Sequence, residues 1–352
     1  SKPHSNLQVA TKPCLSIQSR IMSLAPRSVV IKGTGSYTPA NIKTNDDLAK
    51  LVDTSNEWIF TRSGIKERRI ADETENTSDM GAKAAARALE NAGLEASDID
   101  IVIVATITPD MPFPSTACLV QTKLGIANAI CMDIEAACSG FLYIMEVASA
   151  LLKSGSYRNA LIIGAEKLSS ILDWQDRTTC VLFGDGAGAA ILSISDEADV
   201  GLLDFQLGAD GANSDVLFMP GGGCSQPATP ASIDNRLHYL KMRGREVFKL
   251  AVKVMEQAAK EILEQNELKS DQLACVIPHQ ANMRIIELLA SRLEIPMDRF
   301  YLNLDKYGNT SAASIPIALD EARREGRIQS GDLTLMVAFG AGLTWGAALI
   351  RC

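Results

Sequence analysis

The sequence predicts an α/β fold in which helices cover the faces of β-sheets. Short, apolar or β-rich segments bounded by Gly, Pro or Asp alternate with Ala-rich segments whose apolar residues recur every three or four positions. The first pattern is typical of buried strands and the second of amphipathic helices. Because the two alternate along most of the 352 residues, we expect two packed halves or one large α/β unit.

The expected elements follow one another along the chain. Strands are expected at residues 29–31, 101–105, 129–134, 160–163, 190–194, 275–277 and 333–338, because these runs are short, apolar and bounded by turn residues. Helices are expected at residues 79–92, 140–153 and 247–265, where apolar residues follow the helical period.

Two parts of the chain resemble each other. Residues 89–105 and 263–277 both place Leu-Glu, a further Leu and Ser-Asp before an apolar strand, and KLGI at 123–126 parallels RLEI at 292–295. In this register Cys138 and Asn309 fall within two residues of equivalent positions. A chance match of this looseness stays open. A true duplication predicts halves at residues 28–200 and 201–352, with a pocket at their junction.

Residues 1–27 differ in composition from the rest of the chain. They contain five serines, several basic residues and no acidic residue. We interpret them as a disordered or extraneous extension outside the fold. An organelle transit remnant, an appended sequence and translated sequence upstream of a start at Met22 all fit this composition.

Composition and charge argue against several classes of protein. A net charge of −8 disfavours nucleic acid as a general partner, and no apolar run reaches the length of a membrane span. The eight cysteines are scattered without a C-x-x-C pair, which is typical of a reducing compartment. No H-E-x-x-H motif or Cys/His cluster occurs, so we expect no metal.

The strongest local motif is EAACSGF at residues 135–141, which carries Cys138 between an expected strand and an expected helix. Unpaired N–H groups and partial positive charge at a helix N-terminus favour a thiolate over a thiol. We therefore expect Cys138 to be a nucleophile with a pKa below the ordinary value of roughly 8.5. Taken alone, the motif also fits an inert buried cysteine.

Three further segments carry polar or glycine-rich features at the ends of expected elements. His279 follows the strand at 275–277, where α/β folds place active groups, although a structural or surface histidine fits too. Asn309 lies in KYGNTS before a helix-like run, and a plain turn is the alternative. The glycine-rich segment 338–346 offers backbone N–H groups for an oxyanion.

Residues 184–189 formally match the dinucleotide-binding pattern G-x-G-x-x-G/A. A strand-like run follows them where that motif requires a helix, so we reject a nucleotide site. Glycines between two strands are interpreted instead as a tight turn or a close approach.

Together these segments resemble 3-oxoacyl-[acyl-carrier-protein] synthase III, a branch of the thiolase-fold condensing enzymes. The resemblance extends from about residue 29 to residue 352 and includes residues 56–68, 183–188 and 342–346. It implies a thiolase-like, duplicated five-layer αβαβα fold, a homodimer and no cofactor. Acetyl-CoA, or a short or branched acyl-CoA primer, would be the donor, and malonyl-acyl carrier protein the acceptor.

The resemblance also implies residue roles. Cys138 would carry the acyl group, His279 and Asn309 would stabilise the malonyl-derived enolate, and the oxyanion would meet the N–H of Cys138 and one from Gly340, Ala341 or Gly342. Coenzyme A contacts would come from Trp58, Arg62, Arg177, Asn282 and Phe248. The carrier protein would meet Lys249, Arg284 and Arg292, and Phe113 would close the acyl pocket across the dimer.

Several alternatives remain beside this reading. Chain-elongating relatives use Cys-His-His, so Asn309 favours the initiating class. The resemblance implies a substrate tunnel that Phe248 would line, and Arg245 stands near its mouth, where the resemblance leads us to expect a smaller polar residue. A related enzyme of secondary metabolism or of longer or branched primers shares the motifs. A hydrolytic cysteine enzyme and a non-enzymatic scaffold are more distant rivals.

We expect a cytoplasmic protein, or one of the plastid stroma if residues 1–27 are a transit remnant.

Overall fold

The computed structural model describes residues 28–352 and contains two main β-sheets; the N-terminal extension expected at residues 1–27 lies outside the described residues. The five-stranded sheet has the order β1-β7-β6-β4-β5 and the four-stranded sheet the order β11-β12-β13-β8. The first comprises β1 (Ser28–Tyr37), β4 (Ile101–Ala105), β5 (Ile130–Ile134), β6 (Asn159–Glu166) and β7 (Gly186–Ser195). The second comprises β8 (Gly201–Ala209), β11 (Cys275–Pro278), β12 (Leu333–Gly340) and β13 (Thr344–Arg351).

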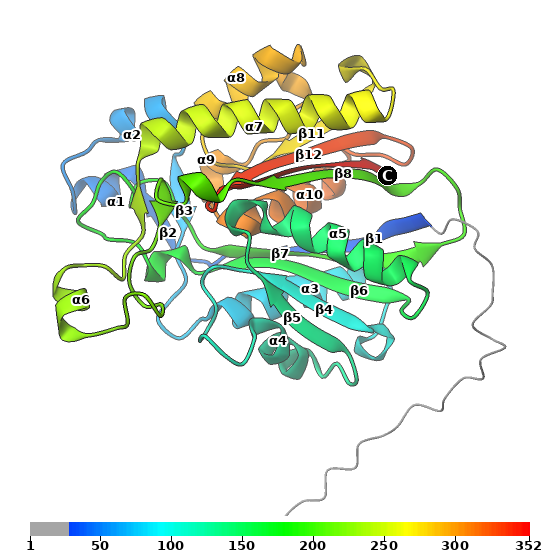
Figure 1. Cartoon of the computed structure of the whole chain (residues 1–352), viewed down its shortest axis with the longest axis horizontal. Coiled ribbons are helices and arrows are strands. Elements are labelled where there is room, and N and C mark those ends of the chain that lie inside the picture. Colours follow the sequence, from blue (N-terminus) through cyan, green and yellow to red (C-terminus); the bar gives the residue numbers. More distant parts are fainter. Residues whose placement is uncertain (1–27) are drawn as a thin grey trace, which may run out of the picture.

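Helices form three layers around these sheets (Figure 1). The outer face of the first sheet carries α3 (Thr77–Ala92) and α4 (Thr116–Leu124), and the outer face of the second carries α7 (Gly244–Gln265) and α8 (Met283–Leu293). Between the sheets lie α5 (Gly140–Lys153) and α10 (Ser314–Arg324), which contact both. Each helix layer encloses a separate apolar core, so most strands are buried on both faces.

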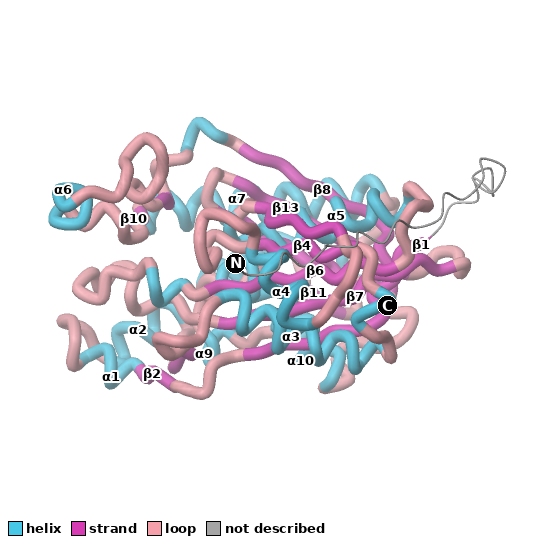
Figure 2. The backbone as a smooth tube through the Cα atoms, turned by 90° about the horizontal axis from the view of Figure 1, so that it is seen from below, coloured by secondary structure: helices cyan, strands magenta, loops and turns pink. Residues whose placement is uncertain are grey.

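The remaining elements gather at one end of the molecule, beyond the strands of the two main sheets (Figure 2). They are β2 (Ile42–Thr44), α1 (Asn45–Ala49), α2 (Asn56–Ser63), β3 (Glu67–Arg69), β9 (Leu217–Phe218), α6 (Pro230–Asp234), β10 (Lys241–Met242) and α9 (Leu304–Tyr307). The turn between β12 and β13 points toward the same end (Figure 1). Loops at one end of a rigid layered scaffold are where functional groups usually lie.

The two sheets repeat one plan, which confirms the expected duplication. The order β1-β7-β6-β4 corresponds to β8-β13-β12-β11, with α3 and α7 outside and α5 and α10 inside. Each inner helix follows a short 3₁₀ turn, η3 (Ala137–Ser139) or η8 (Ser311–Ala313). The first residue of each turn has left-handed backbone, with φ 45° at Ala137 and 49° at Ser311. The division at residue 200 remains our proposal.

The predicted helix at 140–153 has the same bounds in the structure, and the other two begin two or three residues earlier than predicted. In α3 the early start reflects a capping box between Asn76 and Asp79, and Gly93 ends the helix with φ 63°. Helix termini depend on such caps, whereas the apolar period marks only the interior.

The glycines of segment 184–189 agree with the close approach expected from the sequence and not with the tight turn. Gly186 and Gly188 lie inside β7 rather than in a turn between two strands. A Cβ atom on Gly188 would come within 2.6 Å of the backbone of Pro316 and Ile317. Close packing of β7 against α10 is therefore the reason for a glycine there.

Candidate active site

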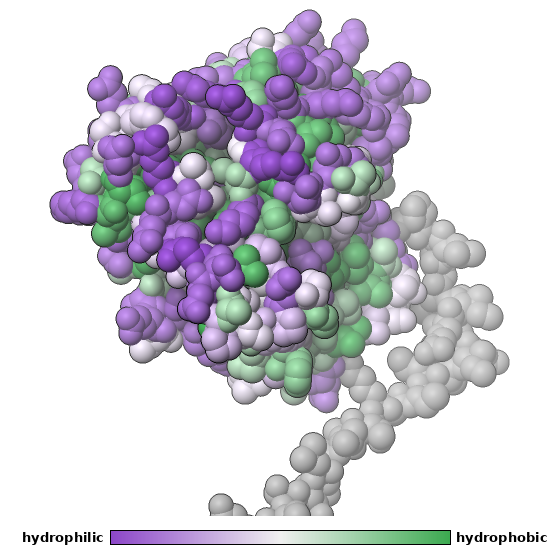
Figure 3. All heavy atoms as spheres, turned by 60° about the vertical axis from the view of Figure 1, so that its left-hand side comes forward, coloured by the Kyte–Doolittle hydropathy of each residue, from purple (hydrophilic) through white to green (hydrophobic). Residues whose placement is uncertain are grey.

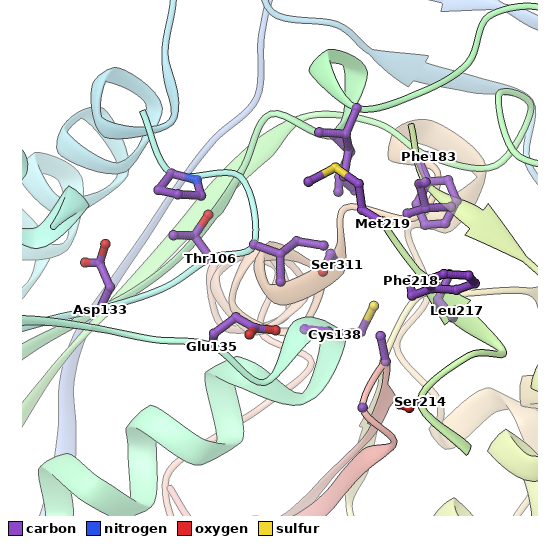
Figure 4. Close-up of a pocket in the computed structure, with 18 of the residues that line it drawn as sticks. Thr106, Asp133, Glu135, Cys138, Phe183, Ser214, Leu217, Phe218, Met219 and Ser311 are labelled. Carbon is purple, nitrogen blue, oxygen red and sulfur yellow. The ribbon is translucent and has the colours of Figure 1, made fainter. Parts of the chain in front are cut away.

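Cys138 lies in η3, between the end of β5 and the start of α5, as the sequence predicted. It is buried, with 7% of its surface exposed, and it lines a cavity of about 570 Å³. Figure 4 shows its sulfur at the N-terminal end of α5, pointing into this cavity. Apolar side chains form much of the cavity wall, among them Ile171, Phe183, Leu217, Phe218, Met219 and Leu240.

Small residues let other parts of the chain approach the cysteine closely. A Cβ on Gly340, the last residue of β12, would lie 2.8 Å from the backbone nitrogen of Cys138. A Cβ on Gly140 would lie 2.9 Å from that of Ala105. These contacts require glycine, and they bring the end of β12 directly against the cysteine turn.

Hydrogen bonds fix the cysteine turn to the β12–β13 turn. The Thr344 hydroxyl donates to the Ala136 carbonyl at 2.9 Å, and the Ser139 hydroxyl donates to Thr344 Oγ1 at 2.6 Å. Ala341 and Gly342 line the same cavity as Cys138. Backbone groups of this turn therefore lie beside the nucleophile, where an oxyanion site requires them. Sequence reasoning included Thr344 in a motif but did not assign it this role.

The predicted lowering of the Cys138 pKa is wrong in this structure. Burial is the main cause that raises the pKa of the thiol to about 12; the Glu166 carboxylate acts in the same direction, and Ser311 lowers the pKa only in part. The helix N-terminus is present, but desolvation of the charged form is the larger effect. Cys138 is therefore a neutral thiol in the unliganded protein, and its proton must leave when it attacks.

His279 lies at the end of β11 and is buried. Its Nδ1 shares a 2.6 Å hydrogen bond with the Ser314 hydroxyl of α10, and its backbone N–H donates to the Val337 carbonyl of β12. Burial lowers the pKa of the imidazole to about 3, so the ring is neutral. When Ser314 donates to Nδ1, Nε2 carries the proton and is a hydrogen-bond donor.

Asn309 lies just before η8, and its backbone bonds to Leu182 and Gly184 on either side of Phe183. Its side-chain Oδ1 accepts from the Ser311 backbone N–H at 2.8 Å. Among the described residues no hydrogen bond engages Nδ2, so the amide presents a donor.

The three predicted residues come from strand ends and turns that pack together. The cysteine turn η3 contacts both β12 and η8, and β11 is the parallel neighbour of β12. Cys138 and Ser311 line the cavity directly, whereas His279 and Asn309 are not among its lining residues. Both side chains keep a little exposed surface, 3% for His279 and 8% for Asn309.

Four of the residues predicted to contact coenzyme A form a second cluster, with Trp58 and Arg62 on α2, Arg177 in the segment before β7 and Asn282 at the start of α8. The guanidinium carbons of Arg62 and Arg177 lie 4.5 and 5.2 Å from the ring centroid of Trp58. The Asn282 side chain caps α8 and donates to the Arg62 carbonyl at 3.0 Å. Phe248 lies apart from this cluster, half-buried on α7, and does not line the cavity.

The predicted carrier-protein residues lie on α7 and α8, and all three are exposed. Arg292 is paired with Glu256 at 2.6 Å, so its charge is partly compensated. No ion pair engages Lys249 or Arg284 in the described part of the chain. Arg245 is also exposed, in the first turn of α7.

The exposure of Phe113, the length and polarity of the helices and the arrangement of metal-ligating side chains bear on possible partners. Phe113 is 84% exposed, which is unusual for a phenylalanine ring. Within residues 28–352, no helix is long and apolar enough to cross a membrane, and no group of three or more His, Cys, Asp or Glu side chains is arranged to hold a metal ion.

Fold and site together define an acyl-transferring condensing enzyme of the thiolase-like α/β class. Family models described as 3-oxoacyl-[acyl-carrier-protein] synthase III and its C-terminal part match residues 132–211 and 263–352. Beta-ketoacyl-[acyl-carrier-protein] synthase III of Caldanaerobacter subterraneus subsp. tengcongensis is 56% identical over 321 residues, covering 91% of this chain and 97% of that protein. The chain therefore belongs to the 3-oxoacyl-[acyl-carrier-protein] synthase III family, as its motifs predicted.

Solved structures agree with this assignment. The 3-oxoacyl-[acyl-carrier-protein] synthase III of Aquifex aeolicus VF5 has a TM-score of 0.86 and 50% identity, covering 92% of this chain and all of that one. The priming beta-ketosynthase of the R1128 polyketide biosynthetic pathway has a TM-score of 0.85 and 36% identity, covering 93% of this chain and 97% of that one.

Proposed function

We propose that this protein catalyses the initiating condensation of fatty acid synthesis. An acyl-CoA primer, foremost acetyl-CoA, would be joined to malonyl-acyl carrier protein, with release of coenzyme A and CO₂ and formation of 3-oxoacyl-acyl carrier protein. The observation that carries the proposal is the position of Cys138, at the head of α5 and inside a cavity, beside the turn formed by Gly340–Gly342.

In the first half-reaction the sulfur of Cys138 attacks the thioester carbonyl of the primer. The carbonyl oxygen becomes an oxyanion, which backbone N–H groups of Cys138 and of the β12–β13 turn would stabilise. Coenzyme A then leaves and the acyl group stays on Cys138 as a thioester.

In the second half-reaction His279 Nε2 and Asn309 Nδ2 would donate hydrogen bonds to the thioester oxygen of the malonyl group. Loss of CO₂ places negative charge on that oxygen, and two neutral donors stabilise it. A neutral imidazole fits this role, because burial keeps the His279 pKa far below neutral pH. The resulting carbanion attacks the acyl thioester on Cys138.

The surface contacts of the substrates belong to the same proposal. The Trp58 ring, with Arg62 and Arg177 beside it, offers a flat, cationic binding surface for a nucleotide base and its phosphates. Lys249 on α7 and Arg284 on α8 are exposed. These helices form the top of the molecule in Figure 1, and the upper part of the surface in Figure 3 is predominantly hydrophilic. We propose this surface as the seat of the acidic carrier protein.

We also propose a homodimer in which a second copy covers Phe113, since a ring exposed to 84% is apolar surface that association would bury. The proposed chemistry uses no cofactor, because the thioester supplies the activated acyl group. We propose a cytoplasmic location; the plastid alternative depends on residues 1–27, which are outside the described residues.

A second candidate is a priming enzyme for longer or branched acyl groups, including one of secondary metabolism. Two observations favour keeping it: the apolar cavity of about 570 Å³ and the similarity to a polyketide-priming ketosynthase. Relative rates with acetyl-, straight-chain and branched acyl-CoA donors separate the two candidates.

We expect acetyl-CoA to acylate Cys138 alone among the eight cysteines. Thioester exchange requires both access to the donor and neighbouring oxyanion donors, and the cavity that Cys138, Ala341 and Gly342 line together supports this expectation. The measurement is mass spectrometry of the intact protein after mixing with acetyl-CoA, followed by peptide mapping. An acyl group mapped to another cysteine, or no acyl group, contradicts the mechanism.

We expect Arg284→Glu to raise the KM for malonyl-acyl carrier protein about tenfold and that for acetyl-CoA little, because it reverses an exposed charge in the proposed carrier seat. Higher salt is expected to act on the carrier KM in the same direction. Arg158→Glu is the control, since Arg158 is also exposed but lies just before β6, in the sheet that α7 and α8 do not cover. Equal changes in both KM values for Arg284→Glu exclude a separate carrier surface here.

A further inference from the structure

Glu166 is a buried acid that the mechanism above does not use. It ends β6 with no exposed surface, and its carboxylate accepts hydrogen bonds from the hydroxyl of Thr108 at 2.6 Å, the hydroxyl of Thr106 at 3.1 Å and the backbone N–H of Ile107 at 3.2 Å. All three donors are neutral. Burial raises the pKa of this carboxyl to about 7, so it exchanges a proton near neutral pH. A charged residue ending the apolar run 160–165 was a visible signal that sequence reasoning missed.

Ser311 lies between this acid and the nucleophile. Its hydroxyl is buried and has no hydrogen-bond partner among the described residues, and η8, which begins with Ser311, contacts both β6 and the cysteine turn η3. The same hydroxyl lowers the pKa of the Glu166 carboxyl and of the Cys138 thiol. Catalytic hydrogen bonds are often loose in unliganded enzymes and tighten with substrate.

The backbone holds Ser311 in this place at a cost. Its φ of 49° is in the left-handed region, which residues other than glycine rarely adopt. The Asn309 side chain accepts from its N–H, and Gly164 of β6 packs so closely on Ala312 that a Cβ would lie 2.2 Å from the Ala312 carbonyl oxygen. An unpartnered buried hydroxyl on strained backbone calls for a functional reason.

The first half-reaction needs an acceptor for the thiol proton, and few titratable groups lie near Cys138. His279 is buried, neutral and held by Ser314, and its pKa of about 3 makes it a weak base. Near Ser311, Glu166 is the carboxylate and Cys138 the thiol, and the Thr106 and Thr108 side chains that bond to Glu166 contribute only hydroxyls.

We propose that Glu166 accepts the Cys138 proton through the hydroxyl of Ser311 during acyl transfer. This rests on the function proposed above. As the Cys138 sulfur attacks the thioester, its proton passes to Ser311 Oγ, and the Ser311 proton passes to the carboxylate of Glu166. The departing coenzyme A thiolate then takes a proton back by the same route, which restores Glu166 as a carboxylate. No proton or electron is left over.

The charges of the site favour this coupled transfer over a free thiolate. The negative charge of Glu166 disfavours a thiolate beside it, which is one cause of the raised Cys138 pKa. When the proton moves from sulfur to Glu166, the site keeps a single negative charge throughout. The buried site therefore never holds a carboxylate and a thiolate together.

The test is the rate of Cys138 alkylation by iodoacetamide as a function of pH, in wild type, Ser311→Ala and Glu166→Gln. We expect an inflection near pH 7 in the wild type. We expect both variants to lose it and to react about 10²-fold more slowly at pH 8, the size of effect typical of a general base. The control is Ser149→Ala, a buried serine of α5 about 16 Å further along the helix; its profile should match the wild type.

Two results of the alkylation experiment would overturn the proposal. If Glu166 only repels the thiolate, Glu166→Gln alkylates as fast as the wild type or faster, and the proposal is overturned. Loss in Ser311→Ala without loss in Glu166→Gln overturns the role of Glu166. If Glu166→Gln does not fold, Ser311→Ala decides alone, because its hydroxyl holds no ordinary hydrogen bond that folding needs.

A second measurement separates this inference from the proposed function. Acetyl transfer from acetyl-CoA should fall in both variants by the same factor as alkylation, whereas CO₂ release from malonyl-acyl carrier protein should stay within a few-fold of the wild type. Alkylation uses no substrate, so it judges the proton route even if no acyl-CoA acylates the wild-type protein, an outcome that defeats the proposed function itself.

Discussion

Cys138→Ser is expected to abolish acyl transfer while leaving decarboxylation of malonyl-acyl carrier protein measurable. A serine hydroxyl is a far weaker nucleophile than a thiol, and the cavity already disfavours charge on this side chain. We expect a loss of about 10⁴-fold or more in acetyl transfer, in the range seen when a nucleophile is removed. Decarboxylation should persist, because His279 and Asn309 are unchanged.

The measurement combines labelled acetyl transfer to the protein with CO₂ release from malonyl-acyl carrier protein. Cys180→Ser is the matched control, since Cys180 is also buried but does not line the cavity. Acetyl transfer that survives in Cys138→Ser contradicts the assignment of the nucleophile. A loss of CO₂ release equal to the loss of transfer contradicts the separation of the half-reactions.

Asn309→Ala is expected to lose about 10²–10³ in the rate of decarboxylation and condensation, because it removes one donor aimed at developing negative charge. Acetylation of Cys138 should stay within a few-fold of the wild type, since proton removal and the oxyanion turn involve other groups. His279→Ala should behave in the same way. It should also keep acetylation if the proton leaves through Ser311 and Glu166.

Asn309→Asp separates the donor role from the structural role. Aspartate keeps an oxygen for the Ser311 N–H, and so preserves the turn, but replaces the Nδ2 donor with an acceptor. We expect it to decarboxylate as poorly as Asn309→Ala. If either variant decarboxylates normally but is not acetylated, the roles assigned to Asn309 and Cys138 are wrong.

Local pattern was sufficient for the secondary structure around the nucleophile. The apolar run of β5, the small residues of η3 and the helical period of α5 occur in one continuous stretch, so the sequence placed Cys138 at a strand–helix junction correctly. The repeat of this plan was also visible, because both halves keep their strands and helices in the same order. Element ends were less predictable, since caps depend on single side chains.

The candidate site was predicted less completely, because its chemistry depends on neighbours far away in sequence. The Glu166 carboxyl, the Ser311 hydroxyl and the Cys138 thiol come from β6, η8 and η3, and no spacing along the chain relates them. The pairing of Arg292 with Glu256 likewise joins two helices and could not be foreseen. Contacts between elements are decided by packing, on which single-sequence patterns carry little information.

By itself, the sequence determined the α/β architecture, the duplicated order of its elements and the family, because these are written in local periodicity and in motifs of contiguous residues. Only the tertiary structure decided the ionisation of the site. The helix N-terminus that the sequence predicted favours a thiolate, but the packing of two sheets around η3 removes Cys138 from water and raises its pKa to about 12. Desolvation depends on the residues that surround Cys138 in the folded protein. Whether it raises the thiol pKa by more than the helix dipole lowers it is therefore decided only when the chain is folded.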